Sequence, residues 1–133
     1  MRKALLIAAI GAVFVPGCDT VQDRPPSWSY IHAAIIAPSC ATASCHSRIS
    51  SVAGRDLSTP ESAYAVLTGR TCNAPPHAGD PPADTASYLL AVLRGEGIRS
   101  NGDVDLLMPP DQPLPEVEIE LVQRWYDAGA KCD

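Results

Sequence analysis

The spacing of apolar and polar residues predicts four helices and no strand pattern of comparable strength. The predicted helices lie within residues 29–38, 58–69, 83–97 and 115–130. Segments rich in proline and glycine precede and follow the third helix, and such segments favour loops. The pattern therefore predicts an all-α domain of short helices joined by long loops.

End signals mark most of these helices. Pro38 is expected to close the first helix. Thr59 is the predicted N-cap of the second, with Pro60 in its first turn and Gly69 at its end. Gly95 is expected to end the third helix in the same way.

Apolar residues at helical spacing predict the buried faces. They are Ile31, Ala34 and Ile35 in the first helix, Tyr88, Leu89 and Val92 in the third, and Val117, Leu121, Trp125 and Ala128 in the last. Aromatic residues make up only 5% of the chain, and the loops are long for a compact domain. We therefore expect a thin core that disulfides or a bound apolar cofactor would complete.

The N-terminus resembles a bacterial lipoprotein signal. Arg2 and Lys3 form a positive head, and residues 4–15 carry no charge, a run too short to span a bilayer comfortably. The stretch "VPGC" then resembles a lipobox ending at Cys18, the residue that would receive the lipid. We expect residues 1–17 to be removed, residues 18–28 to tether the protein to a membrane of the cell envelope, and residues 29–133 to fold.

The negative net charge of the chain argues against one class of function, nucleic-acid binding. Removal of residues 1–17 takes away two basic residues, so the formal net charge changes from −5 to −7. Nucleic-acid binding needs a basic surface, which this composition does not offer. No Ser-His-Asp order, phosphate-binding loop or paired carboxylate is present either, so we expect no enzymatic activity.

The stretch "PSCATASCHS" carries the candidate chemistry. Cys-x-x-Cys-His is the usual attachment site of a c-type haem, but here four residues separate Cys40 from Cys45, and His46 follows. An exported protein has its cysteines oxidised or covalently used. Without Cys18, four cysteines remain, which allow three disulfide pairings, or two thiols on a cofactor and one disulfide. The stretch is thus a haem site, a disulfide loop or, least favoured, a zinc knuckle.

Met108 is the candidate second axial ligand. After loss of the signal it is the only methionine, and Pro109 and Pro110 stiffen the chain behind it. A thioether is a soft ligand that favours ferrous iron and raises the reduction potential. His77 is a weaker substitute ligand in a loop, and His32 is expected at the solvent-facing side or rim of its helix.

Four stretches together resemble the small single-haem cytochromes c, and most closely the planctomycete-type cytochrome c domain. They are "SCATASCHS", "GRDLSTPESAYAVLTG", "AGDPPADTASYLLAVLRGE" and "LLMPPDQPLPEVEIELVQRWYDAGA", within residues 30–130. Gly79-Asp80-Pro81 and the Met-Pro-Pro with its following helix are the more specific motifs. The resemblance implies a cytochrome c-like fold wrapped around one haem.

The same resemblance assigns individual roles. Cys40 and Cys45 would form the thioethers, and His46 and Met108 would be the axial ligands of haem iron. Trp125 would pack where the first and last helices cross. The protein would carry single electrons to or from a redox partner protein. The alternative is a haem-free lipoprotein with a Cys40–Cys45 disulfide, acting as a binding or scaffold module.

Both interpretations leave Cys72 and Cys132 as a pair. Cys72 lies in the central loop and Cys132 just past the last predicted helix. A bridge between them would close about 60 residues and, in the chain-entropy model, stabilise the fold by about 4 kcal/mol.

Overall fold

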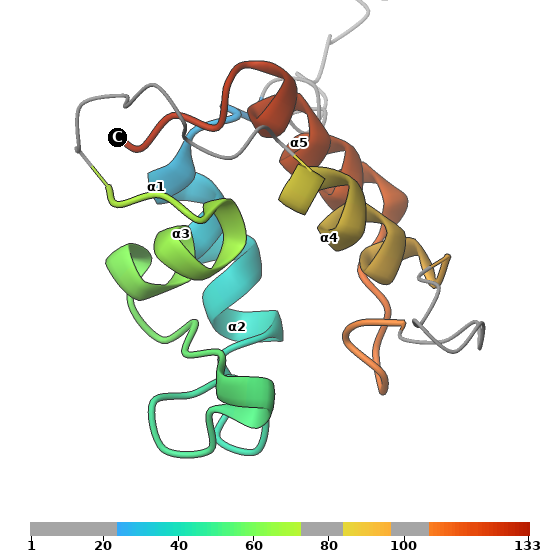
Figure 1. Cartoon of the computed structure of the whole chain (residues 1–133). Coiled ribbons are helices and arrows are strands. Elements are labelled where there is room, and N and C mark those ends of the chain that lie inside the picture. Colours follow the sequence, from blue (N-terminus) through green and yellow to red (C-terminus); the bar gives the residue numbers. More distant parts are fainter. Residues whose placement is uncertain (1–23, 73–83, 97–106) are drawn as a thin grey trace, which may run out of the picture.

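The computed structural model describes residues 24–72, 84–96 and 107–133. Regular structure in these residues is entirely helical, as predicted (Figure 1). The helices are α1 (Trp28–Ile31), the π-helical turn η2 (His32–Ile36), α2 (Ala37–Ser39), the 3₁₀ turn η3 (Val52–Gly54), α3 (Pro60–Thr68), α4 (Asp84–Arg94) and α5 (Glu116–Asp127). The predicted signal peptide, Cys18, His77 and the Gly-Asp-Pro motif lie outside the described residues.

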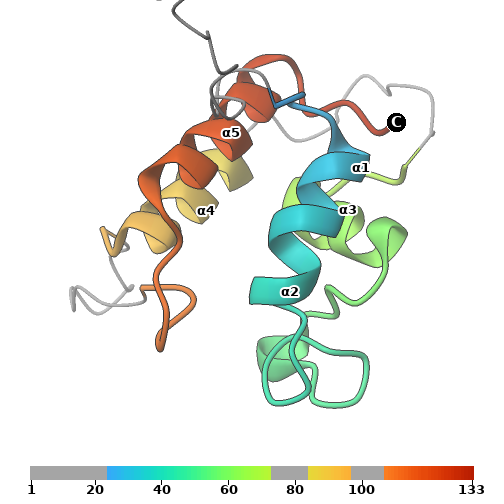
Figure 2. The same cartoon turned by 180° about the vertical axis from the view of Figure 1, so that it is seen from behind.

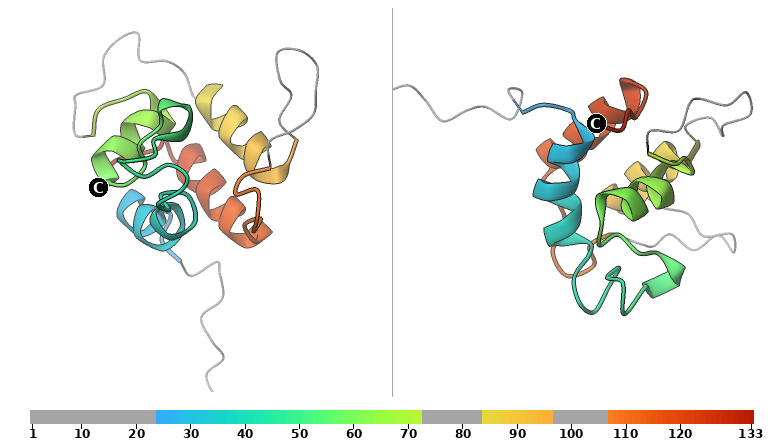
Figure 3. Two further views of the ribbon diagram at one scale, coloured as in Figure 1. Left: turned by 90° about the horizontal axis from the view of Figure 1, so that it is seen from below. Right: turned by 90° about the vertical axis from the view of Figure 1, so that its left-hand side faces the viewer.

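The helices form two groups. The segments α1, η2 and α2 form one continuous helical rod, and α3 packs against it. Helices α4 and α5 lie beside each other in the other half of the domain (Figures 1 and 2). The end of α5 crosses the start of the rod, so the first and last helices are in contact. The long loop that follows α2 hangs below the rod and returns to α3 (Figure 3).

The first helix runs one residue beyond the predicted stop. The N–H of Ala37 donates to the carbonyl of His32, five residues back, and α2 ends at Ser39 rather than at Pro38. Proline has no N–H to donate to the carbonyl four residues back. The wider π turn accommodates it, and Cys40 becomes the residue that ends the rod.

The other predicted helix ends are confirmed. Thr59 caps α3, since its hydroxyl accepts from the N–H of Ser62 and the Ser62 side chain in turn accepts from the N–H of Thr59. Gly69 and Gly95 follow α3 and α4 with φ of 68° and 71°, a left-handed conformation that glycine adopts without strain. At Gly95 a Cβ would also lie 3.4 Å from the Leu107 side chain.

The buried faces differ from prediction at several positions. Ile31, Ile35, Val92, Leu121 and Trp125 are buried as expected. Ala34, Tyr88, Val117 and Ala128 are exposed instead. In the rod, the π turn moves burial to the neighbouring His32 and Ile36. In α5, contacts with both α4 and α1 bury two adjacent rows, and those rows include Ile119, Val122 and Tyr126.

The core is better filled than composition suggested. Trp28 of α1 stacks on Trp125 of α5, with ring centroids 5.0 Å apart, and Tyr64 of α3 lies edge-on to Trp28 at 5.6 Å. Tyr126 completes the group, 4.7 Å from Trp125. Four of the few aromatic residues thus gather in one cluster, and Trp125 packs where the first and last helices cross, as expected.

Each of these rings also places its polar atom on a backbone carbonyl. The indoles of Trp28 and Trp125 donate to Pro60 and Lys131 at 3.1 and 2.8 Å. The hydroxyls of Tyr64 and Tyr126 donate to Ala130 and Leu67 at 2.8 and 2.7 Å. Buried polar atoms are costly unless paired, so these bonds fix how the helices and the C-terminal segment fit together.

The C-terminal segment is also covalently tied. Cys72 and Cys132 form a disulfide with Cα atoms 5.4 Å apart, which confirms the predicted pair. Next to it, the Asp133 carboxylate accepts from the N–H and hydroxyl of Ser29 at the start of the rod. The two ends of the described domain are therefore held together.

Candidate functional site

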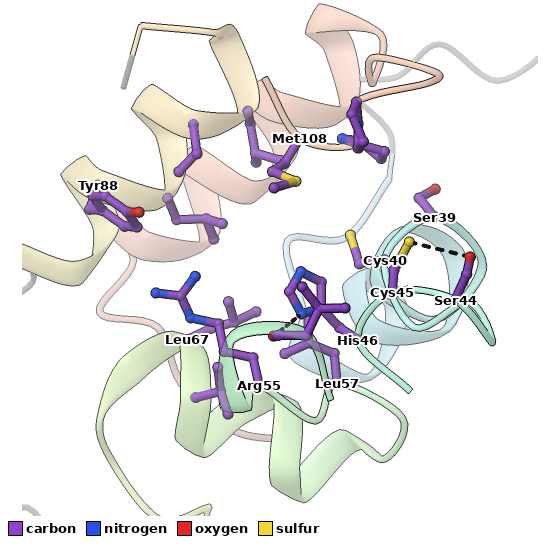
Figure 4. Close-up of a pocket in the computed structure, with 17 residues that line it drawn as sticks. Ser39, Cys40, Ser44, Cys45, His46, Arg55, Leu57, Leu67, Tyr88 and Met108 are labelled. Carbon is purple, nitrogen blue, oxygen red and sulfur yellow. Dashed lines mark hydrogen bonds between the residues drawn. The ribbon is translucent and has the colours of Figure 1, made fainter. Parts of the chain in front are cut away.

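A cavity of about 350 Å³ lies between the loop after α2, helix α3, helix α4 and the segment before α5 (Figure 4). Its walls are mostly apolar. The lining residues include all four predicted haem residues, namely Cys40, Cys45, His46 and Met108. Its size falls in the range of about 300–1,000 Å³ typical of small-molecule sites. The fold therefore brings Cys40 and Met108, 68 positions apart in the sequence, to one pocket.

The His46 ring has a defined tautomer. Its Nδ1 lies 3.1 Å from the carbonyl oxygen of Val52. A carbonyl only accepts hydrogen bonds, so Nδ1 donates to it, and in the neutral imidazole the lone pair is on Nε2. Metal-ligating histidines are held in this way, with the other ring nitrogen donating to a carbonyl, which fixes the ring and raises its basicity.

A sharp turn aims the Val52 carbonyl at His46. Ser51, Ala53 and Gly54 all have positive φ, at 41°, 56° and 70°. Such conformations cost free energy in residues other than glycine and persist only where the surroundings impose them. Here the turn brings the carbonyl of Val52 back over the imidazole six residues earlier.

Hydrogen bonds hold the rest of this loop. The N–H of His46 donates to the carbonyl of Cys40 at 3.1 Å, and the N–H of Val52 donates to the carbonyl of Cys45 at 3.0 Å. The Ser50 hydroxyl also donates to the Cys45 carbonyl at 2.6 Å. The four residues between the cysteines thus form a closed, bonded loop that keeps both thiols at the cavity.

His32 supports the same loop, contrary to the expectation that it faces solvent. It is only 6% exposed, and its Nε2–H donates to the carbonyl of Leu57 at 3.2 Å. The N–H of Leu57 donates to the carbonyl of His46 at 2.8 Å. The prediction was wrong because the buried face of the rod is wider than the expected stripe, and His32 connects the rod to the segment behind His46.

The two candidate thiols are free and differ in environment. Burial, with a smaller contribution from the neighbouring Cys45, raises the pKa of the Cys40 thiol to about 11. Hydrogen bonds from the side chains of Thr42 and Ser44 lower the pKa of Cys45. The Cys40–Cys45 disulfide of the haem-free alternative is therefore not formed in this structure.

Met108 reaches the cavity from the opposite side. Its N–H donates to the carbonyl of Val92 in α4 at 3.0 Å, which fixes the backbone where the thioether enters. Pro109 and Pro110 follow and line the cavity themselves. Figure 4 shows the Met108 side chain above and the His46 ring below, with the space of the cavity between them.

The donor set suits haem better than zinc. One imidazole and one thioether on facing walls, with two thiols at one end of an apolar pocket, match the ligands of haem iron in cytochromes c. Structural zinc takes four Cys, His or carboxylate ligands. Within the described residues, no three such side chains converge on one point. These residues therefore fit a haem, and they offer no ligand set for the zinc alternative.

The sequence analysis missed one residue that lines the cavity and misplaced another. Arg55 was not singled out, and Tyr88 was expected inside the core but is 49% exposed at the cavity rim. The Arg55 guanidinium lies 5.9 Å from the centroid of the Tyr88 ring. A lone arginine in a loop gives no sequence signal, because only the fold brings it to the pocket. His77 lies outside the described residues.

Comparisons of this chain with family models, curated proteins and solved structures found no match. Across the described residues, no helix combines the length and the apolar character needed to cross a bilayer. The function of the chain is therefore inferred from its own residues.

Proposed function

We propose that this protein is a single-electron carrier with a cytochrome c-like fold, which binds one c-type haem through Cys40 and Cys45 with His46 and Met108 as axial ligands. The observation that carries the proposal is the pair of His46 and Met108 facing each other across an apolar cavity (Figure 4). The hydrogen bond from His46 to Val52 adds support, because it leaves Nε2 with a free lone pair.

Each side chain has a distinct part in this function. The cofactor would supply the reversible one-electron change between ferric and ferrous iron. Cys40 and Cys45 would each add S–H across a vinyl group, so that sulfur bonds to one carbon and the proton goes to the other. The Val52 carbonyl holds the His46 ring, and the Met108 thioether would favour the ferrous state. Leu57, Leu67 and Val92 give the cavity an apolar wall against which the flat ring system would pack.

We further propose that the protein is anchored in the cell envelope and exchanges electrons with another protein. Lipid on Cys18 would hold the domain at a membrane of the cell envelope, and the residues between Cys18 and the start of α1 at Trp28 would serve as the tether. Electrons would pass to or from a redox partner protein. The motivation is the charged head, apolar run and "VPGC" stretch of the N-terminus.

An absorption spectrum of the protein isolated from its native membrane tests the proposal. We expect the sharp reduced-state bands of a low-spin c-type haem in the folded protein, and haem that stays attached to the chain when the protein is unfolded. His46→Ala should lose most of the haem, whereas His32→Asn should retain it, because the His32 ring bonds to the Leu57 carbonyl and does not line the cavity. A colourless protein with a Cys40–Cys45 disulfide would instead favour the haem-free binding or scaffold module.

A further inference from the structure

The positively charged side chain of Arg55 lies at one end of the cavity. Arg55 and Tyr88 line it at the side away from Cys40 and Cys45, as Figure 4 shows. Both residues are exposed, so this end of the pocket opens to solvent. The guanidinium sits over the Tyr88 ring at 5.9 Å, an attraction that holds it in place without neutralising its charge.

No carboxylate of the described residues pairs with Arg55. The neighbouring Asp56 accepts instead from the N–H and hydroxyl of Ser58, at 2.9 and 2.6 Å. Among these residues the ion pair within 4.0 Å is that of Arg94 with Glu116, at the other helix pair. The Arg55 guanidinium therefore keeps its donors available at the rim of an apolar pocket.

We propose that Arg55, assisted by the Tyr88 hydroxyl, binds the carboxylates of the ligand in this cavity. This inference rests on the proposed haem function. A haem carries its vinyl groups along one edge and its two propionates along the opposite edge. A guanidinium opposite the thiols therefore recognises the propionate edge, since Arg pairs with carboxylates through two parallel hydrogen bonds.

The consequence is orientation of the ligand before it is attached. With the propionates at Arg55, the vinyl groups face Cys40 and Cys45. Orientation matters here, because four residues separate the cysteines instead of the usual two. Arg55 is thus a positioning residue, which acts on the geometry of attachment.

Reversible binding to the full-length chain tests this inference. In a Cys40→Ala/Cys45→Ala background, haemin and haemin dimethyl ester are titrated in the same detergent. We expect Arg55→Met to reduce the preference for the free acid over the ester about fivefold, the equivalent of an exposed ion pair of about 1 kcal/mol. Arg48→Met is the matched control, since Arg48 is exposed on the same loop but does not line the cavity.

One further variant and one further measurement test the inference more closely. Arg55→Lys should restore part of the preference, because it keeps the charge and loses the fork of donors. In the covalently loaded protein, Arg55→Met should lower the midpoint potential more than Arg48→Met does, since a cation near the iron disfavours the ferric form.

The outcomes separate the inference from the function on which it rests. If haemin binds but the acid-to-ester preference is the same in Arg55→Met as in the background, Arg55 does not recognise carboxylates and the inference is overturned. If neither porphyrin binds and the native protein carries no haem, the proposed function itself fails.

Discussion

Removal of the Cys72–Cys132 disulfide should destabilise the domain strongly. The bridge joins residues 60 positions apart. In the chain-entropy model, closing a loop of that length lowers the entropy of the unfolded chain by about 14 cal/mol/K, or about 4 kcal/mol at 25 °C. Small domains are stable by only about 5–15 kcal/mol, so this single bond supplies a large share.

The folded state should change little in the Cys72→Ser/Cys132→Ser variant. The C-terminal segment keeps its other bonds, from Tyr64 to the carbonyl of Ala130 and from Ser29 to Asp133. The loss therefore arises in the unfolded chain, which gains conformations. Circular dichroism of the folded variant should match that of the wild type.

Urea unfolding measures the effect, with both proteins in the same haem-loaded or haem-free form. For a slope of about 2 kcal/mol/M, the midpoint should fall by about 2 M. A matched Ser39→Ala variant, which leaves the disulfide intact, should not shift it comparably. A loss below about 1 kcal/mol would refute the entropic reasoning, since strain in the folded state would then offset most of the stabilisation.

Three other predictions concern the ligand, the anchor and the C-terminus. Met108→Ala should abolish the weak near-red band of a ferric Met–haem bond and lower the reduction potential while the haem stays attached; if only His77→Ala has these effects, His77 is the ligand. Cys18→Ser should move the protein from the detergent phase to the aqueous phase, and a wild type that is already aqueous contradicts the lipid anchor. Hydrogen bonds from the backbone N–H and side chain of Ser29 lower the pKa of Asp133, so its contribution to stability is present above the unfolded pKa and is lost as the pH falls through the lower, folded value. Asp133→Asn should therefore flatten the acid side of the stability–pH curve, and an unchanged slope would show that the hydrogen bonds between Ser29 and the Asp133 carboxylate contribute nothing.

Local signals in the sequence were enough to predict the helices and most of their ends. Thr59, Gly69 and Gly95 act through the backbone of their own turn, so their roles do not depend on the rest of the fold. Pro38 was misjudged by one residue, because a π turn relaxes the rule that proline ends a helix. Such a turn leaves no simple trace in sequence.

Burial was harder to predict, because it depends on which helices become neighbours. Val117 belongs to the expected stripe of α5 but is 40% exposed, since α4 and α1 contact other rows of that helix. His32 is buried for a similar reason. Its hydrogen-bond partner, the carbonyl of Leu57, is 25 residues further along the chain, so the local pattern of apolar residues could not predict this contact.

For the candidate site as well, the residue types could be predicted and their arrangement in space could not. Cys40, Cys45, His46 and Met108 could be selected from the sequence because their types and order carry the chemistry. What the sequence could not give was the tertiary geometry: the turn that brings the Val52 carbonyl onto His46, and the approach of Arg55 to Tyr88.

The most direct test of the central claim is the mass and spectrum of the intact protein after unfolding and acid–acetone extraction. We expect one haem per chain that resists extraction, mapped to a peptide containing Cys40 and Cys45, with Cys72 linked to Cys132. A chain that yields no haem, with Cys40 joined to Cys45, would contradict it and identify the "CATASCH" stretch as a disulfide loop.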